Sequence, residues 1–190
     1  NFRLIKDRYI INSKFNISKN DKIVSVQYSG DTHNNGRSVL ILEFKTGKKL
    51  VYKPRNVSIE NGFQEYITFF NQKLPNLNLY SLKVVDRLEY GWIEFVYFKE
   101  LKNKSESISY YKKLGVLLSI VHSINGVDIF FENLITSGDN PIIIDLETMF
   151  HTSIENNKTA SPKNSLQNFI NSSVIGIGIL PQPNRGSDEM

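Results

Sequence analysis

Residues 38–54 read SVLILEFKTGKKLVYKP, and this stretch gives the clearest indication of the fold class. Two runs rich in β-branched, aromatic and aliphatic residues flank a Lys45-Thr46-Gly47-Lys48 turn, which is the pattern of a β-hairpin. Lys53 falls at the end of the second predicted strand. Residues 81–98, SLKVVDRLEYGWIEFVYF, repeat the pattern around a turn at Glu89-Tyr90-Gly91. The two hairpins predict an antiparallel sheet in the first half of the chain.

Helical periodicity lies between and after these hairpins. An apolar stripe with spacing i, i+4, i+7 and i+11 is formed by Phe63, Ile67, Phe70 and Leu74. It predicts a helix that ends near Pro75 and carries Glu65 away from the apolar face. Residues 108–124, ISYYKKLGVLLSIVHSI, predict a buried helix that stops at Asn125-Gly126, since glycine commonly follows the last helical residue.

A small hairpin is predicted after this helix. Residues 125–147, NGVDIFFENLITSGDNPIIIDLE, give a short loop, the strand NLIT, a turn at residues 137–140 and the strand PIIID. Residues 151–167 are polar and predict a loop. The fold class is therefore predicted as α+β, with a mostly antiparallel, sheet-rich region over residues 1–99 and a helical region, incomplete in this chain, over residues 100–190.

Composition excludes several functional classes. The 190 residues carry a net charge of +4 without a basic run, so no nucleic-acid-binding tract is visible. There is no cysteine, and the three histidines His33, His122 and His151 lack metal-ligand spacing, so a zinc site is not expected. No apolar run approaches the roughly 20 residues of a membrane span, and a cytoplasmic location is expected. The chain begins without methionine and is expected to be an excised segment.

Five residues follow the general plan of protein kinases, which need a strand lysine that holds phosphates, a helix glutamate that pairs with it, an Asp/Asn pair five residues apart and a metal-binding aspartate after a short hairpin. The candidates occur in that order: Lys53, Glu65, Asp128, Asn133 and Asp145. A fixed cation and carboxylate-held Mg²⁺ would neutralise the transferred phosphoryl group, while an aspartate orients the attacking hydroxyl. The order and spacing together favour a phosphoryl-transfer site.

Departures from that plan leave other interpretations open. Asp-Leu-Glu stands where protein kinases have Asp-Phe-Gly. On an extended chain Glu147 would point to the same side as Asp145, so it is a further candidate metal ligand beside Asn133 and Asp145. The glycine-rich kinase loop is absent. Each candidate taken alone also has a structural interpretation, in which Lys53 is a solvated charge and the acidic and amide side chains form turns or caps.

A second polar cluster, YSGDTHNNGRSV, spans residues 28–39. Asp31, His33 and Arg37 place an acid, an imidazole and a fixed cation within seven residues, which suits phosphate binding or proton transfer. The glycines and asparagines equally suit a plain turn.

Several motifs together resemble the N-terminal dehydratase domain of class II lanthipeptide synthetases, the LanM type. They are SGDTHNNGRSVLILEFKTGKKLVYKPR, YGWIEFV, NGVDIFFENLI, PIIIDLETMF and SVIGIGILP, in uninterrupted order from about residue 28 to residue 181. The resemblance implies a two-lobed, lipid-kinase-like fold. It implies an enzyme that phosphorylates Ser and Thr of a precursor peptide with ATP and Mg²⁺ and then eliminates phosphate to leave dehydroamino acids.

Roles follow from the resemblance by position. Lys53 would contact the ATP phosphates, Asp128 and Asn133 would form the phosphotransfer loop, and Asp145 with Glu147 would hold metal. Asp31 and His33 match family residues tied to eliminating the phosphate. The resemblance also implies two partners, a precursor peptide with a leader and a C-terminal zinc cyclase that lies outside this chain. The family also uses an arginine and a threonine in elimination, and these too are expected outside this chain.

Phe130 departs from the family pattern, because the family's loop reads Asp-x-His-x-x-Asn and this chain has Phe130 in place of the histidine. A phenyl ring neither donates nor accepts a hydrogen bond, so impaired phosphorylation is predicted. Two alternatives stay open: a pseudoenzyme that binds nucleotide or leader peptide, favoured by Phe130, and a phosphotransferase for a small molecule or lipid, which the residue 28–39 cluster disfavours.

Overall fold

The computed structural model describes residues 2–33, 37–127, 129–149, 169–170 and 173–180, with side chains described outside residues 30–37. The chain divides into two compact units, residues 1–97 and residues 98–190, and each is described by itself. This division falls two residues before the boundary expected from the sequence. The α+β class and the antiparallel sheet are confirmed.

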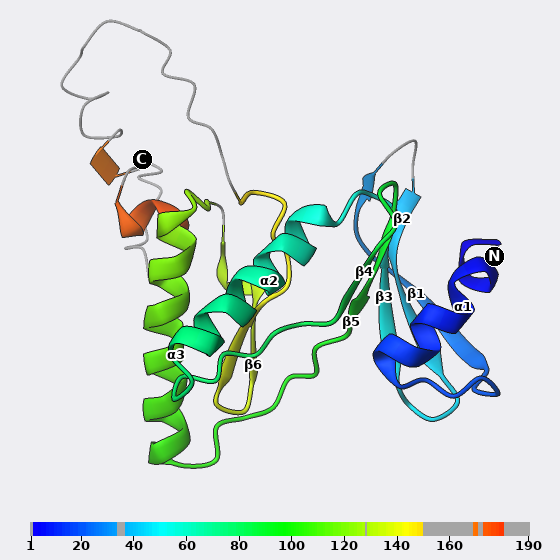
Figure 1. Ribbon diagram of the computed structural model, residues 1–190, viewed down its shortest axis with the longest axis horizontal. Coiled ribbons are helices and arrows are strands. Elements are labelled where there is room, and N and C mark those ends of the chain that lie inside the picture. Colours follow the sequence, from blue (N-terminus) through cyan, green and yellow to red (C-terminus); the bar gives the residue numbers. More distant parts are fainter. Residues whose placement is uncertain (1, 34–36, 128, 150–168, 171–172, 181–190) are drawn as a thin grey trace, which may run out of the picture. The chain divides into compact units, whose positions relative to one another are not determined.

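The first unit is an antiparallel sheet with two helices (Figure 1). Its five strands have the spatial order β1-β2-β3-β5-β4. The elements along the chain are α1 (Phe2–Phe15), β1 (Ile23–His33), β2 (Arg37–Phe44), β3 (Lys49–Lys53), α2 (Ser58–Lys73), β4 (Val84–Asp86) and β5 (Gly91–Glu94). The strand β1 lies at one edge of the sheet, and β4 lies at the other.

Both predicted hairpins of this unit are present. The β2–β3 turn places Gly47 at φ +82°, in the left-handed region that favours glycine, and the Phe44 amide donates to the Lys48 carbonyl at 2.8 Å. The β4–β5 turn comes slightly earlier than predicted, because Gly91 already belongs to β5 and Leu88 carries the positive φ of +64°.

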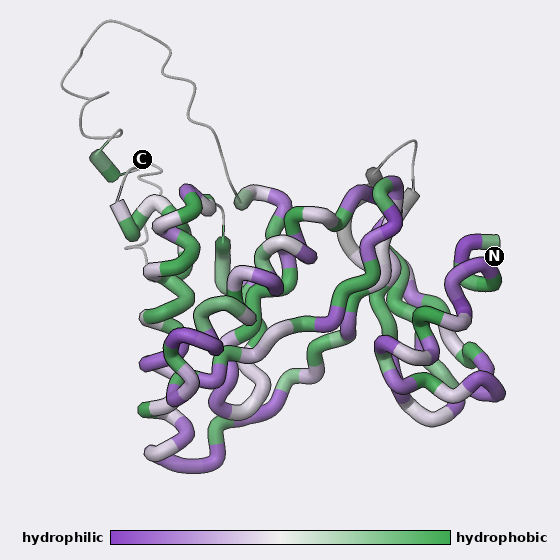
Figure 2. The backbone as a smooth tube through the Cα atoms, in the orientation of Figure 1, coloured by the Kyte–Doolittle hydropathy of each residue, from purple (hydrophilic) through white to green (hydrophobic). Residues whose placement is uncertain are grey.

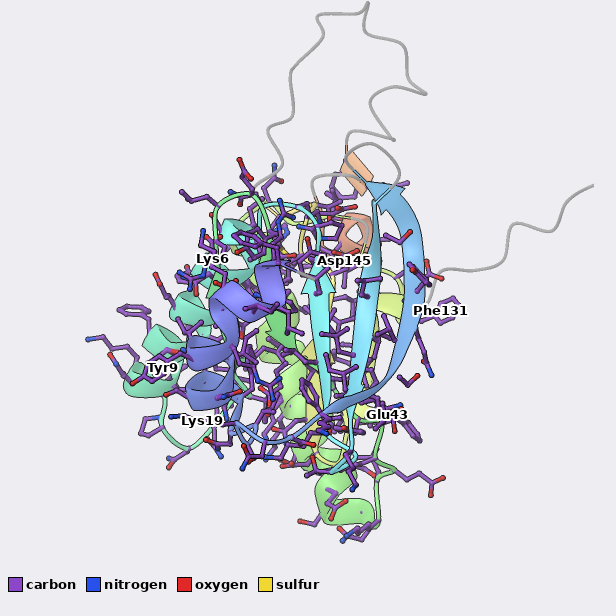
Figure 3. All side chains as sticks on the ribbon, turned by 90° about the vertical axis from the view of Figure 1, so that its right-hand side faces the viewer. Lys6, Tyr9, Lys19, Glu43, Phe131 and Asp145 are labelled. Carbon is purple, nitrogen blue, oxygen red and sulfur yellow. The ribbon has the colours of Figure 1, made fainter. Side chains whose placement is uncertain are left out.

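The core of the first unit lies between the sheet and α1. Ile11 and Ile17 pack with apolar residues from four strands, and the buried members of this cluster include Leu42, Phe44, Leu50, Tyr52, Val85 and Trp92. Burying a side chain of this size stabilises the fold by about 1.5–3 kcal/mol. The outer side of α1 is exposed, and Lys6 and Tyr9 point away from the sheet in Figure 3.

The sequence patterns above predict neither α1 nor β1. Hydrophilic and hydrophobic residues mix along α1 (Figure 2), and its inward face carries the fully buried Asp7. The Trp92 Nε1–H donates to Asp7 Oδ2 at 2.8 Å, and Arg87 lies 2.9 Å from Asp7 Oδ1. Burial, followed by the nearby Asp7 carboxylate, raises the pKa of Tyr90 above its ordinary value. A charged residue therefore holds α1 on the sheet.

The second unit is built on α3 (Lys104–Ser123), which lies alongside a two-stranded hairpin of β6 (Leu134–Ser137) and β7 (Asn140–Ile143) (Figure 1). Two short 3₁₀ helices, η1 (Phe131–Asn133) and η2 (Val174–Ile177), complete its described elements. The N-terminal half of α3 is more hydrophilic than the C-terminal half (Figure 2), and its buried residues are Tyr110, Lys113, Leu117, Ile120 and Val121.

The predicted helix over residues 108–124 and the hairpin after it are confirmed, with one correction. The left-handed residue that ends α3 is Asn125, at φ +55°, rather than Gly126. Gly126 is buried and has no room for a side chain. A Cβ there would lie 2.7 Å from Val121 Cγ1 and 2.6 Å from Met149 Sδ. The loop predicted over residues 151–167 lies outside the described residues. Over the part of the chain described, no helix is both long and apolar enough to cross a bilayer.

Candidate functional site

Lys53 ends β3 as predicted, and its ammonium group is buried against a carboxylate. The side chain is 9% exposed, and Nζ lies 3.1 Å from Oε1 of Glu60. Glu60 lies in the first turn of α2 and is 2% exposed. Arg55 reaches the same oxygen, with its NH2 nitrogen 2.8 Å from Oε1. A strand lysine and a glutamate of the next helix are therefore paired.

The paired glutamate is Glu60, and the expectation that Glu65 contacts Lys53 is wrong. Glu65 is exposed and accepts a hydrogen bond at 2.9 Å from Nδ2 of Asn61 on its own helix. Glu60 precedes Phe63 by three residues, so helical periodicity puts it on the buried face. This spacing is the signal that sequence reasoning missed: a carboxylate on the apolar face of a helix needs a buried cation.

Close packing between Gly91 and Val57 explains how Glu60 comes near Lys53. Gly91 is the β5 partner of Lys53, and a Cβ at Gly91 would lie 2.1 Å from Cγ2 of Val57. Val57 is fully buried and immediately precedes α2. Glycine therefore allows the start of α2 to pack tightly against the sheet, and the first turn of the helix brings Glu60 to the end of β3.

Two cations share one carboxylate in this cluster. Lys53 and Arg55 both lie on Glu60. Both cations reach Oε1, and none of the described residues donates a hydrogen bond to the buried Oε2 of Glu60. A buried carboxylate is tolerated only when it is paired, and here it fixes two basic side chains that suit the binding of phosphate oxygens.

In the second unit, the β6–β7 hairpin brings Asn133 and Asp145 to one end. Asn133 closes η1 immediately before β6, and the Ile144 amide donates to its carbonyl at 3.0 Å. Asp145 is the next residue and is half-buried. An amide oxygen and a carboxylate completed by water suit Mg²⁺, which rarely takes an all-protein cage. No cluster of three or more His, Cys, Asp or Glu occurs among the described residues.

Glu147 does not continue the strand that ends near Asp145. The Met149 amide donates to the Leu146 carbonyl at 3.1 Å, and Leu146 is buried while Glu147 is exposed in the resulting turn. The sequence argument placed Glu147 beside Asp145 on an extended chain. The chain instead turns at residues 146–149, so Glu147 lies in a turn, and its role as a metal ligand stays a prediction.

Asp128 lies outside the described residues, but the backbone on both sides of it is well held. The Val127 amide donates to the Thr148 carbonyl at 3.4 Å, and the Ile129 amide donates to the Ile177 carbonyl at 2.8 Å. Gly178 follows η2 at φ +95°, and a Cβ there would lie 3.2 Å from the Ile129 carbonyl oxygen. The Gly-Ile-Gly motif of the sequence thus braces the loop that carries Asp128.

Asp31 and His33 belong to the end of β1 rather than to a turn. A register irregularity lies between Ser29 and Thr32, and His33 pairs with Arg37 of β2. The backbone therefore places Asp31 and His33 near the hairpin end of an edge strand, and their side chains lie outside the described part of the structure. Residues 34–36, the centre of the possible turn, lie outside the described residues.

Phe130 and Phe131 present two aromatic rings to solvent at the start of η1. Phe130 is 44% exposed and Phe131 is 87% exposed. The ring of Phe131 projects outward in Figure 3, which also labels Asp145. Because residue 130 is exposed and its backbone is extended, at φ −79° and ψ 169°, an imidazole fits there without repacking.

Comparison with known proteins gives two matches. Residues 2–190 match the family described as "Domain of unknown function (DUF4135)". A curated relative, the lacticin 481/lactococcin biosynthesis protein LcnDR2 of Lactococcus lactis subsp. lactis, is 36% identical over 189 residues. The alignment covers 93% of this chain and 20% of the relative, so the chain spans about a fifth of that protein's length.

Proposed function

The chain belongs to the DUF4135 family, the N-terminal domain family of LanM-type proteins, and from this premise we propose that it is part of a lanthipeptide dehydratase. The observation that carries the proposal is the ion pair between Lys53 and Glu60, since a strand lysine held by a glutamate of the next helix is the phosphate-binding device of kinases. The name of LcnDR2 ties that relative to lantibiotic biosynthesis, which agrees with this function.

The proposed reaction has two steps. A Ser or Thr hydroxyl of a precursor peptide first takes the γ-phosphoryl group of ATP. The peptide then loses its α-proton and the phosphate, which leaves a carbon–carbon double bond. The two-lobed, lipid-kinase-like arrangement is part of this proposal, as are a leader-bearing precursor peptide and a C-terminal zinc cyclase as partners in the whole enzyme.

Each candidate residue has a place in the first step. Lys53 binds phosphate oxygens while Glu60, which Arg55 also contacts, orients the ammonium group of Lys53. Asp128 orients the attacking hydroxyl. Bound Mg²⁺–ATP would supply the phosphoryl group and neutralise the charge that develops on it.

The oxygens of Asn133 and Asp145 would hold the metal in this proposal, with Glu147 as a further ligand. Asp31 and His33 act in the second step, where an acid and an imidazole can move the proton and the phosphate. Glu65 has no part in this assignment, because it lies on the exposed face of α2.

Mass spectrometry tests the proposal. The full-length protein is incubated with ATP, Mg²⁺ and a Ser/Thr/Cys-containing precursor peptide, and the expected products have gained phosphate or lost water. Lys53→Met and Asp145→Asn should each lower product formation at least 100-fold, while Glu65→Gln should leave it unchanged. An unmodified peptide mass with the wild-type protein would contradict the dehydratase function.

Phe130 favours a second candidate, a pseudoenzyme that keeps nucleotide or leader-peptide binding. Phe130→His distinguishes the two functions, because general acid–base groups contribute about 100-fold or more to proton transfer. In an impaired enzyme, this exposed substitution should raise phosphorylation without changing stability. If the variant and the wild type both bind ATP and neither modifies the peptide, the binding module is the better description.

A further inference from the structure

Lys113 is a buried lysine that the proposed reaction does not use. It lies on the inward face of α3 and is 6% exposed. Its Nζ donates to Oδ2 of Asp139 at 2.8 Å and to Oδ1 of Asn140 at 2.8 Å. Ser109, one helical turn earlier, donates from Oγ to the same Asp139 oxygen at 2.7 Å. The helix therefore offers two donors to the β6–β7 turn.

The turn end of the hairpin is also held by backbone contacts. The Lys99 amide donates to the Thr136 carbonyl at 3.0 Å, and the Gly138 amide donates to the Lys99 carbonyl at 3.0 Å. Thr136 Oγ1 donates to the Tyr110 hydroxyl of α3 at 3.1 Å. The hairpin is thus fixed at its turn by α3 on one side and by residue 99 on the other.

Asn133 and Asp145 lie at the opposite end of this hairpin. Each strand has four residues, so the two ends are about 13 Å apart. A rotation of about 10° at the turn would move the far end by about 2 Å. Displacements of about 1 Å at reacting groups are enough to lower rates about 100-fold. Small changes at the turn are therefore amplified where the metal ligands lie.

We propose that Lys113 is a positioning residue that sets the orientation of the β6–β7 hairpin on α3 and so places Asn133 and Asp145 for a divalent cation. This inference rests on the proposed function in one respect, the assignment of Asn133 and Asp145 as the metal-binding pair.

The contact between Lys113 and Asp139 is better suited to orienting the β6–β7 hairpin than to stabilising the fold. A buried ion pair often contributes no more stability than an apolar contact of similar size, but it has a defined direction. Lys113 and Ser109 donate to one oxygen, which fixes the Asp139 carboxylate in two directions. These hydrogen bonds hold the pKa of Asp139 below its ordinary value, so the contact stays charged at neutral pH.

A double variant separates orientation from stability. Lys113→Met combined with Asp139→Asn removes both charges, so neither is left buried alone and the fold should persist. In the full-length protein with ADP, Mn²⁺ affinity is measured from the free Mn²⁺ signal in electron paramagnetic resonance. We expect about 10-fold weaker binding, the usual effect of losing a group that supports metal ligands. Ile120→Val, a buried change on the same face of α3, is the matched control and should leave Mn²⁺ affinity unchanged.

Hydrogen exchange gives a readout that needs no metal. The Ile144 amide, which donates to the Asn133 carbonyl, should exchange about 10-fold faster in the double variant and as in wild type in Ile120→Val. If the double variant does not fold, Lys113→Met alone serves, because the Asp139 side chain is 35% exposed and water can replace the lysine.

Asp145→Asn keeps the two proposals distinguishable. If it abolishes Mn²⁺ binding while the double variant binds Mn²⁺ like the wild type, the positioning role of Lys113 is wrong. If Asp145→Asn has no effect on Mn²⁺ binding, the metal assignment is wrong, and the exchange of Ile144 decides on Lys113. Unchanged exchange in the double variant would then overturn the positioning role, and faster exchange would support it.

Discussion

Two buried lysines, one in each unit, are paired in different ways. Lys53 is 7% exposed and Lys113 is 6% exposed, and each ammonium group lies about 3 Å from a carboxylate. Glu60 beside Lys53 is 2% exposed and shared with Arg55, whereas the Asp139 side chain beside Lys113 is 35% exposed. A fully buried carboxylate cannot be solvated when its partner is lost, while a partly exposed one can.

The groups around the Lys53–Glu60 pair also differ from those around the Lys113–Asp139 pair. At Lys53, two basic side chains share the Glu60 carboxylate, and basic side chains suit the binding of phosphate oxygens. The cluster around Lys113 pairs one charge with one charge and adds two neutral groups, which suits a fixed contact. The comparison shows that the same residue type serves different purposes, depending on how many charges its carboxylate must satisfy.

Among the substitutions that test this comparison, Glu60→Gln should lower the free energy of unfolding most. It leaves Lys53 and Arg55 beside a neutral amide in a buried place, and breaking a buried ion pair costs about 3–5 kcal/mol. Native-state hydrogen exchange of β3 and α2 amides in the full-length protein measures the loss. Glu65→Gln on the exposed face of the same helix should stay within about 0.5 kcal/mol. Equal effects of the two substitutions would contradict the assignment of Glu60.

Gly91→Ala should have an intermediate effect, confined to the first unit. The added methyl group would lie 2.1 Å from Val57 Cγ2, and overpacking of this kind costs about 1–3 kcal/mol. Because Val57 leads into α2, the exchange protection of the first turn of α2 should fall with it. Gly62→Ala is the matched control, since nothing lies within 4 Å of the new Cβ, and it should stabilise α2 by up to about 1 kcal/mol.

Asp139→Asn should have the smallest effect and should depend on pH. Hydrogen bonds from Lys113 and Ser109 lower the pKa of Asp139 in the folded protein below its usual 3.8. The stability that the carboxylate contributes is therefore present above about pH 4 and is lost as the pH falls through the lower, folded pKa. At pH 7 the wild type should be more stable than the variant by about 1 kcal/mol, because the Lys113 ammonium group keeps its hydrogen bond to Oδ1 of Asn140. Exchange of β6 and β7 amides at pH 7 and pH 3 measures this, and a pH-independent difference would be the contrary result.

Much of the fold follows from local patterns. Period-two runs predict the β2–β3 and β6–β7 hairpins, and the stripe that begins at Phe63 predicts α2, because strand and helix geometries repeat over a few residues. The edge strand β1 also has such a signal in Val24, Val26 and Tyr28, which alternate along the chain and are exposed. α1 has a poorer signal, since Asp7 occupies an inward position whose partners lie 80 or more residues away.

Some features of the candidate site likewise follow from local sequence, and others follow only from the tertiary structure. Sequence alone determined the order and spacing of Lys53, Asn133 and Asp145, because these follow from motifs and from a short hairpin. Only the tertiary structure decided that Glu60 is the partner of Lys53, that the chain turns before Glu147, and that Lys113 holds the hairpin. Those outcomes depend on which buried charges can meet across a packed interior, where an unpaired charge is costly, and local periodicity carries no information about such distant contacts.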